Sequence, residues 1–352
     1  MSATLLFLST AEALSEALLL DQATSKEIAE VSKIYPFRIP QYYINLMEKE
    51  NPRCPVRLQA VPSASELRPG GEKDPLAEGG IHLTPSLIKR YPKRAVFLVS
   101  SECAMYCRFC NRKRAIGRGA AWEASAEETL RRLDSDREVS EVILSGGDPL
   151  MLPPAHFAYI LDRLRANRRI HVIRVSSRLP VVFPGAIQEG HFEALRKHAP
   201  IWCIIHTNHP REITPEFAGV AARFREAGAA LVSQTVLLRG VNDSPYILAR
   251  LFEGLVRLGV KPYYLFQLDD VEGAQHFKVK VRAGMALMKE LRRSVSGLCM
   301  PHYALDITGG LGKVPLEHGY VRKRQGTRLT VENTAGDTGV YMDDGAYPNS
   351  KS

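Results

Sequence analysis

The chain has 352 residues, of which 45% are hydrophobic and 24% are charged, and its formal net charge is +9. This composition is typical of a globular protein and excludes a disordered or collagen-like chain. No apolar run reaches the ~18 residues of a membrane-spanning helix, so we expect no membrane association.

The positive charge is scattered along the chain, and its densest group is Arg108, Arg112, Lys113 and Arg114. A nucleic-acid site requires basic residues gathered on one face, so we expect no nucleic-acid partner. The chain has six cysteines, three of them within eight residues. Cysteines used in this way indicate a protein of the reducing cytoplasm.

The first 90 residues are predicted to form a helical and loop-rich extension. Apolar residues recur at helical spacings between residues 10 and 35, and a short helix is predicted over 40–48. Residues 50–90 are rich in Pro, Gly and charge, which predicts loops over the core. Glu12 and Glu16 interrupt the apolar start, and no Lys or Arg precedes it, so we expect an amphipathic helix and no signal peptide.

From residue 94 onward, short apolar runs alternate with amphipathic stretches. The runs cover residues 95–99, 142–144, 172–175, 201–205, 231–238 and 263–268. Strands that alternate with helices predict a parallel sheet with right-handed crossovers. Six such units predict an α/β fold with a partial (β/α)6 barrel.

The chain is therefore divided into three predicted parts. Residues 1–90 form the N-terminal extension, residues 91–305 the partial barrel, and residues 306–352 a short C-terminal segment. The tail from about Thr327 is rich in Gly, Asn and Asp and is predicted to lie irregularly on the surface or to fray.

Three cysteines stand close together in a Cys-x3-Cys-x2-Cys pattern, at Cys103, Cys107 and Cys110. They suit a soft metal centre better than a disulfide, which would leave one thiol unpaired. An iron–sulfur cluster usually has four cysteine ligands, so one iron here would be open to a small molecule. A three-ligand zinc site is the main alternative. Three buried thiols without a metal are a second alternative.

Polar groups follow all six predicted strands, in the loops where βα barrels carry their chemistry. Turns favour the same residue types for steric reasons, so the prediction depends on the shared position of the six loops. The loops are Cys103–Cys110, Ser145–Pro149, Ser176–Arg178, His206–His209, Arg239–Asp243 and Asp269–Asp270.

Two of the polar segments are glycine-rich. Ser145-Gly146-Gly147-Asp148 is predicted to expose successive backbone amides and one carboxylate, because glycine lets the backbone approach a ligand closely. The segment Asp306–Lys313 resembles a phosphate loop only superficially, since Ile307 replaces its first glycine. A lysine on a mobile glycine loop can form a Schiff base, although most lysines are simply exposed.

The cysteine pattern, with an aromatic residue just before Cys110, resembles the cluster loop of radical S-adenosylmethionine enzymes. The resemblance implies a 4Fe-4S cluster on the three cysteines, whose open iron chelates S-adenosylmethionine. It also implies that Ser145, Gly146, Gly147 and Asp148 hold the amino group of S-adenosylmethionine.

Together with the lysine loop, the chain resembles one family, the lysine 2,3-aminomutases, from about Phe37 to about Tyr320. The matching segments are residues 90–94, 103–114, 145–150, 177–180, 206–214, 234–242, 262–277 and 306–315. The resemblance implies pyridoxal 5′-phosphate bound covalently to Lys313. The other cofactor residues that it implies are Arg90, Tyr91 and Arg94 at the phosphate, and His206 and Gln234 along the pocket.

The resemblance also assigns the groups that hold the substrate. Arg112 matches the family's carboxylate clamp, and a guanidinium suits this planar anion. Asp269 and Asp306 match two acids that receive a side-chain ammonium. An unpaired buried charge costs about 3–5 kcal/mol, so this acid pair is expected to reject glutamate. Turn capping or solvation is the alternative role of two such acids.

The implied function is a radical interconversion of L-lysine and β-lysine (3,6-diaminohexanoate), started by a 5′-deoxyadenosyl radical while the substrate is bound to pyridoxal phosphate. The alternatives are a sister enzyme that makes β-lysine for elongation factor P, an aminomutase for arginine or glutamate, and a non-catalytic iron–sulfur or zinc protein. The expected partners are lysine, an electron donor such as flavodoxin or ferredoxin, and further copies of the chain. Ser244 replaces a zinc-binding cysteine of some relatives, and no cysteine follows Cys299, so no structural zinc is expected.

Overall fold

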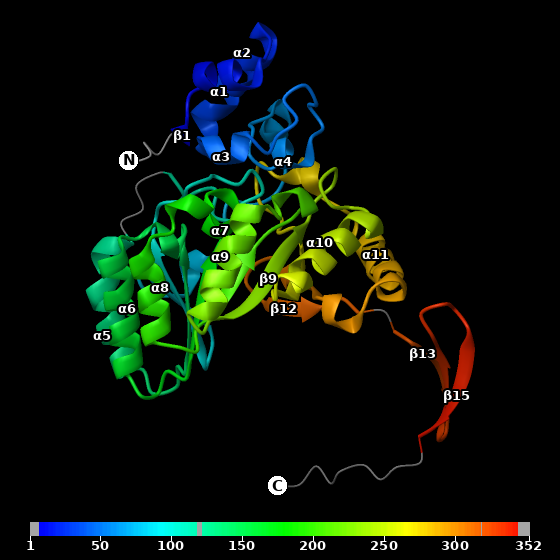
Figure 1. Cartoon of the computed structure of the whole chain (residues 1–352). Coiled ribbons are helices and arrows are strands. Elements are labelled where there is room, and N and C mark those ends of the chain that lie inside the picture. The colour runs from blue at the N-terminus through cyan, green and yellow to red at the C-terminus, as the bar shows by residue number, and fades with distance from the viewer. Residues whose placement is uncertain (1–6, 118–121, 318, 344–352) are drawn as a thin grey trace.

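The computed structural model describes residues 7–117, 122–317 and 319–343 (Figure 1). Its main body is a ten-stranded sheet with the strand order β12-β11-β10-β9-β8-β7-β6-β5-β4-β3. Strands β5 to β11 pair with their neighbours in parallel. They are β5 (Arg94–Ser100), β6 (Glu141–Gly146), β7 (Val172–Ser177), β8 (Trp202–His206), β9 (Ala230–Leu237), β10 (Lys261–Gln267) and β11 (His302–Ile307).

Helices connect the parallel strands and cover the outer face of the sheet (Figure 1). In α10, the residues Leu248, Leu251, Phe252 and Leu255 are buried, which is the spacing of one helical face packed on a sheet. The longer connecting helices are α5 (Ala126–Ser135), α6 (Pro154–Ala166), α8 (Glu189–Lys197), α9 (Pro215–Glu226), α10 (Pro245–Arg257) and α11 (Val281–Ser294). None of the helices in the described part of the chain is long and apolar enough to cross a membrane.

The predicted partial barrel is confirmed, and its six predicted strands correspond to β5 through β10. The sheet also contains β11, followed by the antiparallel strand β12 (Gly312–Pro315). Neither strand is apparent from the sequence, because β11 is only partly buried and β12 follows a glycine-rich turn. The predicted boundary between residues 305 and 306 therefore falls inside a strand.

The N-terminal extension forms two helices, α1 (Ala11–Leu18) and α2 (Gln22–Ile34), instead of one continuous helix. The break comes at Leu19, whose φ of 55° is left-handed, and α2 restarts where Asp21 accepts a hydrogen bond from the Thr24 amide at 2.7 Å. The short helix predicted over residues 40–48 is α3 (Gln41–Ile44), which follows β2 (Ile39–Pro40) and its partner β1 (Phe7–Leu8).

The segment predicted as loops over residues 50–90 also contains regular structure. It includes α4 (Pro55–Leu58) and the two antiparallel strands β3 (His82–Thr84) and β4 (Leu87–Tyr91). Because β4 pairs with β5, the edge of the sheet begins before the predicted boundary at residue 90.

The irregular tail predicted from about Thr327 is wrong for residues 328–332 and 338–342, which are strands. This part of the chain contains the antiparallel strands β13 (Val321–Gln325), β14 (Arg328–Glu332) and β15 (Thr338–Met342), which form a sheet separate from that of the barrel (Figure 1). Glu332 of β14 pairs with Lys289 of α11 at 2.8 Å. Residues 344–352, which the same prediction includes, lie outside the described residues.

Candidate active site

Two adjoining cavities lie along the parallel strands: the larger is at their carboxyl ends, and the smaller is lined by residues nearer the starts and middles of the strands, such as Arg94 and Arg174. The larger has a volume of about 360 Å³ and contains the cysteine loop in its wall, and the smaller has a volume of about 210 Å³. Arg112, Gln234 and Lys313 line both cavities. Every residue predicted for the site lines one cavity or the other. The larger also includes Cys103, Cys107, Cys110, Ser145, Gly146, Gly147, Asp148, His206, Asp269 and Asp306, and the smaller includes Arg90, Tyr91 and Arg94.

Cys103, Cys107 and Cys110 follow β5 and are partly exposed to the larger cavity, whereas the isolated Cys203 and Cys299 are buried. Burial raises the pKa of all three clustered thiols, and that of Cys110 rises to about 11. A bound cation is therefore needed to keep them as thiolates, the form that ligates iron. Within the described residues no three His, Cys, Asp or Glu side chains converge on a single ion. The donor set still fits a cluster, in which each cysteine binds a different iron.

The basic residues of the cysteine loop are paired with acids of the segment that precedes β3. Arg108 and Lys113 each contact Glu66 at 2.6 Å, and Arg112 contacts Glu78 at 2.7 Å. Both acids are buried, so these ion pairs fix the loop against the protein. The sequence gives no local signal for Glu66 or Glu78, because the pairs join positions far apart in the chain.

The glycine segment after β6 binds the protein rather than a ligand through two of its amides. The Gly147 and Asp148 amides donate to the Ser100 and Glu102 carbonyls at 2.5 and 2.7 Å. The Asp148 carboxylate accepts bonds from the Ser177 hydroxyl at 2.7 Å and from the Arg178 amide at 2.8 Å. The prediction of exposed amides and an available carboxylate is therefore wrong at these two residues. Their contact with a cofactor stays a prediction.

Replacing Gly147 with alanine is expected to displace the cysteine loop, because an added Cβ would collide with the Glu102 backbone. Overpacking of this kind destabilises a fold by about 1–3 kcal/mol. Urea unfolding measures the change. Gly185→Ala is the matched control, since its Cβ would meet no atom within 4 Å. Equal stability of the two variants would contradict the proposed contact.

Lys313 lies in β12, directly opposite Asp306 of β11, and its ammonium forms an ion pair with the Asp306 carboxylate. Its Nζ lies 3.9 Å from the centre of the Phe266 ring, and its amide donates to the Tyr91 hydroxyl at 3.0 Å. The prediction placed Lys313 on a mobile loop. Instead, strand pairing holds it, and the glycine turn ends just before it.

Besides Arg112, three further arginines line the smaller cavity, which suits a phosphate. Arg90 and Arg94 come from the segment predicted for this purpose. The third, Arg174, was not predicted. It lies in the middle of β7 and pairs with Glu141 at 2.7 Å. A charged residue within an otherwise apolar strand was the available signal, because such a side chain must face a polar group or a cavity.

Asp269 and Asp306 both line the larger cavity, beside Lys313. Burial raises the pKa of Asp269 to about 7, and the negative charge of Asp306 adds to the increase. The Asn111 amide donates to Asp269 at 3.1 Å. The Lys313 ammonium pairs with Asp306, and Asp269 has no ion-pair partner among the described contacts. When Asp269 is ionised, its charge favours a further cation.

Arg112 donates to Glu78 through both Nε and Nη2, at 3.0 and 2.7 Å, and its Nη1 lies 3.3 Å from the Ser145 hydroxyl. Glu78 thus fixes the plane of the guanidinium, and Nη1 has no acid partner in the described contacts.

His206 and Gln234 are neighbours in adjacent strands. Burial, followed by the charge of Arg178, lowers the pKa of His206 to about 3, so this side chain is neutral. Its Nε2 has no hydrogen-bond partner among the described residues.

Comparisons with known proteins identify the family. Residues 97–251 match the model of the radical SAM superfamily. The chain is 37% identical to the L-lysine 2,3-aminomutase of Acetoanaerobium sticklandii, over 88% of this chain and 76% of the relative. It is 34% identical to the L-lysine 2,3-aminomutase of Clostridium subterminale, over 95% of this chain and 81% of the relative. It is 32% identical to the glutamate 2,3-aminomutase of Clostridioides difficile, over 95% of this chain and 79% of the relative. The chain belongs to the lysine 2,3-aminomutase family of radical S-adenosylmethionine enzymes.

Proposed function

We propose that this chain is an L-lysine 2,3-aminomutase, which interconverts L-lysine and β-lysine. One observation carries the proposal: a pair of carboxylates, Asp269 and Asp306, lies with Lys313 between the cysteine loop and the arginine-lined cavity. The acid pair supplies the charge that recognises a cationic side chain, and it adjoins the residues suited to both cofactors.

The residues of the two cavities fit the family's cofactors. Cys103, Cys107 and Cys110 would hold the 4Fe-4S cluster with S-adenosylmethionine, and Lys313 and the arginines would hold pyridoxal phosphate. When bound, these groups supply a hydrogen-abstracting radical and a carbonyl carbon through which an amino group can migrate. The protein's own residues then bind and orient the amino acid and exclude water.

The substrate would be held at three points. Its α-amino group would lie near Lys313, its carboxylate would face Nη1 of Arg112, and its side-chain ammonium would lie between Asp269 and Asp306. The ion pair with Glu78 limits rotation of the Arg112 guanidinium, so the carboxylate donor is oriented before the substrate binds. A preorganised donor loses less conformational entropy on binding.

Charge favours lysine over glutamate as the substrate. The identities of 37% and 32% to lysine and glutamate aminomutases are too similar to decide between the two. A glutamate side chain would add a third carboxylate beside Asp269 and Asp306, and like charges this close repel each other in a cavity of low dielectric. A lysine side chain would neutralise one of the two instead.

The proposal also extends to the surroundings of the enzyme. The six free cysteines suit a reducing cytoplasm. Reduction of a cluster requires a one-electron donor, for which a flavodoxin or ferredoxin is suitable. We also propose that the chain acts as a homo-oligomer.

The test is an anaerobic assay of the protein reconstituted with iron, sulfide, pyridoxal phosphate and S-adenosylmethionine. Lysine, arginine and glutamate are supplied separately, and β-isomers are measured by mass spectrometry. The expected result is β-lysine at a rate at least tenfold above that of any other β-isomer. A faster reaction with glutamate would contradict the role of the acid pair.

A further inference from the structure

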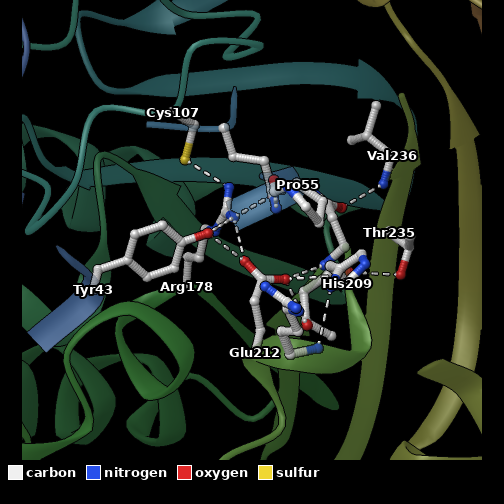
Figure 2. Close-up of polar contacts among 12 residues, drawn as sticks. Tyr43, Pro55, Cys107, Arg178, His209, Glu212, Thr235 and Val236 are labelled. Carbon is white, nitrogen blue, oxygen red and sulfur yellow. Dashed lines mark hydrogen bonds and ion pairs between the residues drawn. The ribbon is translucent and has the colours of Figure 1, made fainter. Parts of the chain in front are cut away.

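The side chain of Arg178, from the loop after β7, joins the cysteine loop to a buried acid (Figure 2). Its Nη1 donates to the Cys107 sulfur at 2.9 Å. Its Nη2 donates to Gln59 at 2.7 Å and to Glu212 at 2.8 Å. Arg178 is 7% exposed and Glu212 is fully buried. The guanidinium thus contacts both the Cys107 sulfur and the buried Glu212 carboxylate.

The position of Arg178 is fixed by the protein and does not depend on a ligand. The Asp148 carboxylate accepts hydrogen bonds from the amides of Arg178 and Leu179, at 2.8 and 2.9 Å. The guanidinium also lies 5.0 Å from the centre of the Phe109 ring, in the cysteine loop itself. These contacts hold both ends of the side chain, so its charge stays beside Cys107.

Glu212 is held equally firmly. Its second carboxylate oxygen accepts bonds from the Asn208 and His209 amides, at 2.6 and 2.9 Å, and from the Thr207 hydroxyl at 3.1 Å. Burial raises the pKa of Glu212, but Arg178 and the amide donors more than offset this effect, and the pKa lies below its ordinary value. The acid is therefore ionised and balances Arg178.

The two charges have opposite effects on a cluster at this loop. Reduction adds one electron, taken from a low-potential one-electron donor, and makes the cluster and its thiolates more negative. A cation and a hydrogen bond at the Cys107 sulfur favour that state, and they raise the reduction potential. The carboxylate of Glu212 partly cancels the cation and lowers the potential.

We propose that Arg178 and Glu212 set the reduction potential of the cluster that Cys103, Cys107 and Cys110 bind, with Arg178 raising the potential and Glu212 lowering it. They are positioning residues that act through the Cys107 sulfur. The inference rests on the cluster of the proposed function, which iron content and visible absorbance of the reconstituted protein test separately.

The experiment is an anaerobic redox titration of the reconstituted protein, followed by electron paramagnetic resonance of the reduced cluster. Arg178→Gln is expected to lower the midpoint potential and Glu212→Gln to raise it. Each is expected to change the reduction equilibrium at least tenfold, which is 59 mV for one electron. The double variant removes both charges, so it leaves no buried ion unpaired, and its potential is expected between those of the single variants.

Asp136→Asn is the matched control, because Asp136 is also a buried acid paired with a cation, Lys89. It lies just before β6, at the opposite end of the parallel strands from the cysteine loop, and its substitution is expected to leave the potential unchanged.

The outcomes separate the two proposals. Shifts in the same direction for both single variants would overturn the inference, as would unchanged potentials in loaded proteins. Loss of the cluster from all three variants would also overturn it, since the residues would then be structural only. Wild-type protein that binds no iron would instead refute the proposed function.

Discussion

Replacing Lys313 with alanine is expected to abolish turnover while leaving the cluster absorbance intact. Lys313 is the lysine that lines both cavities, and strand pairing fixes its position opposite Asp306. Loss of a covalent cofactor attachment is expected to lower the rate by at least about 1000-fold, or roughly 4 kcal/mol of activation free energy. The measurement is the anaerobic β-lysine assay together with the visible spectrum.

The role of Lys313 has a spectroscopic control. Wild-type protein with pyridoxal phosphate is expected to have an absorbance that borohydride bleaches, and the reduced cofactor is expected on the peptide that contains Lys313. Lys289→Ala is the matched variant, because Lys289 lies in α11 and pairs with Glu332, away from both cavities. Normal turnover by Lys313→Ala would refute its assignment.

Replacing Asp269 with asparagine is expected to reduce kcat/KM for lysine about 100-fold, while pyridoxal phosphate binding stays unchanged. The reason is the loss of a buried carboxylate partner for the substrate ammonium, worth about 3 kcal/mol. Asp270→Asn is the control, since Asp270 is half exposed and pairs with Lys278 at 2.6 Å. Equal losses of lysine use and cofactor binding would mean that Asp269 is structural.

The raised pKa of Asp269 predicts that kcat/KM for lysine depends on pH. In the proposed function the ionised form of Asp269 would bind the substrate ammonium, and burial raises the pKa of Asp269 in the free protein to about 7. Lysine binding is therefore expected to be fully developed above pH 7 and to weaken as the pH falls below it. The profile of kcat/KM reports this free-enzyme pKa, and the acid limb is expected to vanish in Asp269→Asn. An unchanged limb in the variant would assign it to another group.

The sequence predicted the positions of the site residues because strand ends in a parallel sheet share one edge. Once apolar runs located β5 through β10, the loops that follow these strands were expected to lie together at the carboxyl end of the barrel. Chemistry then distinguished the loops, since three cysteines and two acids are uncommon in such turns. The order of elements and the six polar loops thus follow from local patterns, whereas the roles of Arg112, Lys313 and the acid pair were implied by the resemblance to the lysine 2,3-aminomutases.

What the sequence could not provide are contacts between distant segments. Glu78 orients Arg112 across 34 residues, and no periodicity predicts that pair. Asp148 was expected to offer a free carboxylate, but that carboxylate accepts hydrogen bonds from Ser177 and Arg178 in the neighbouring loop. Lys313 was placed on a loop, because only its pairing with β11 makes that short segment a strand.

The proposed function is tested most directly by following one hydrogen atom from C3 of lysine to 5′-deoxyadenosine and back to the product. Lysine deuterated at C3 is supplied to the reconstituted protein, and 5′-deoxyadenosine and β-lysine are analysed by mass spectrometry. Deuterium is expected in 5′-deoxyadenosine and at C2 of β-lysine, because the substrate would lie where the two cavities adjoin. β-Lysine formed with no deuterium in 5′-deoxyadenosine would contradict the proposed function.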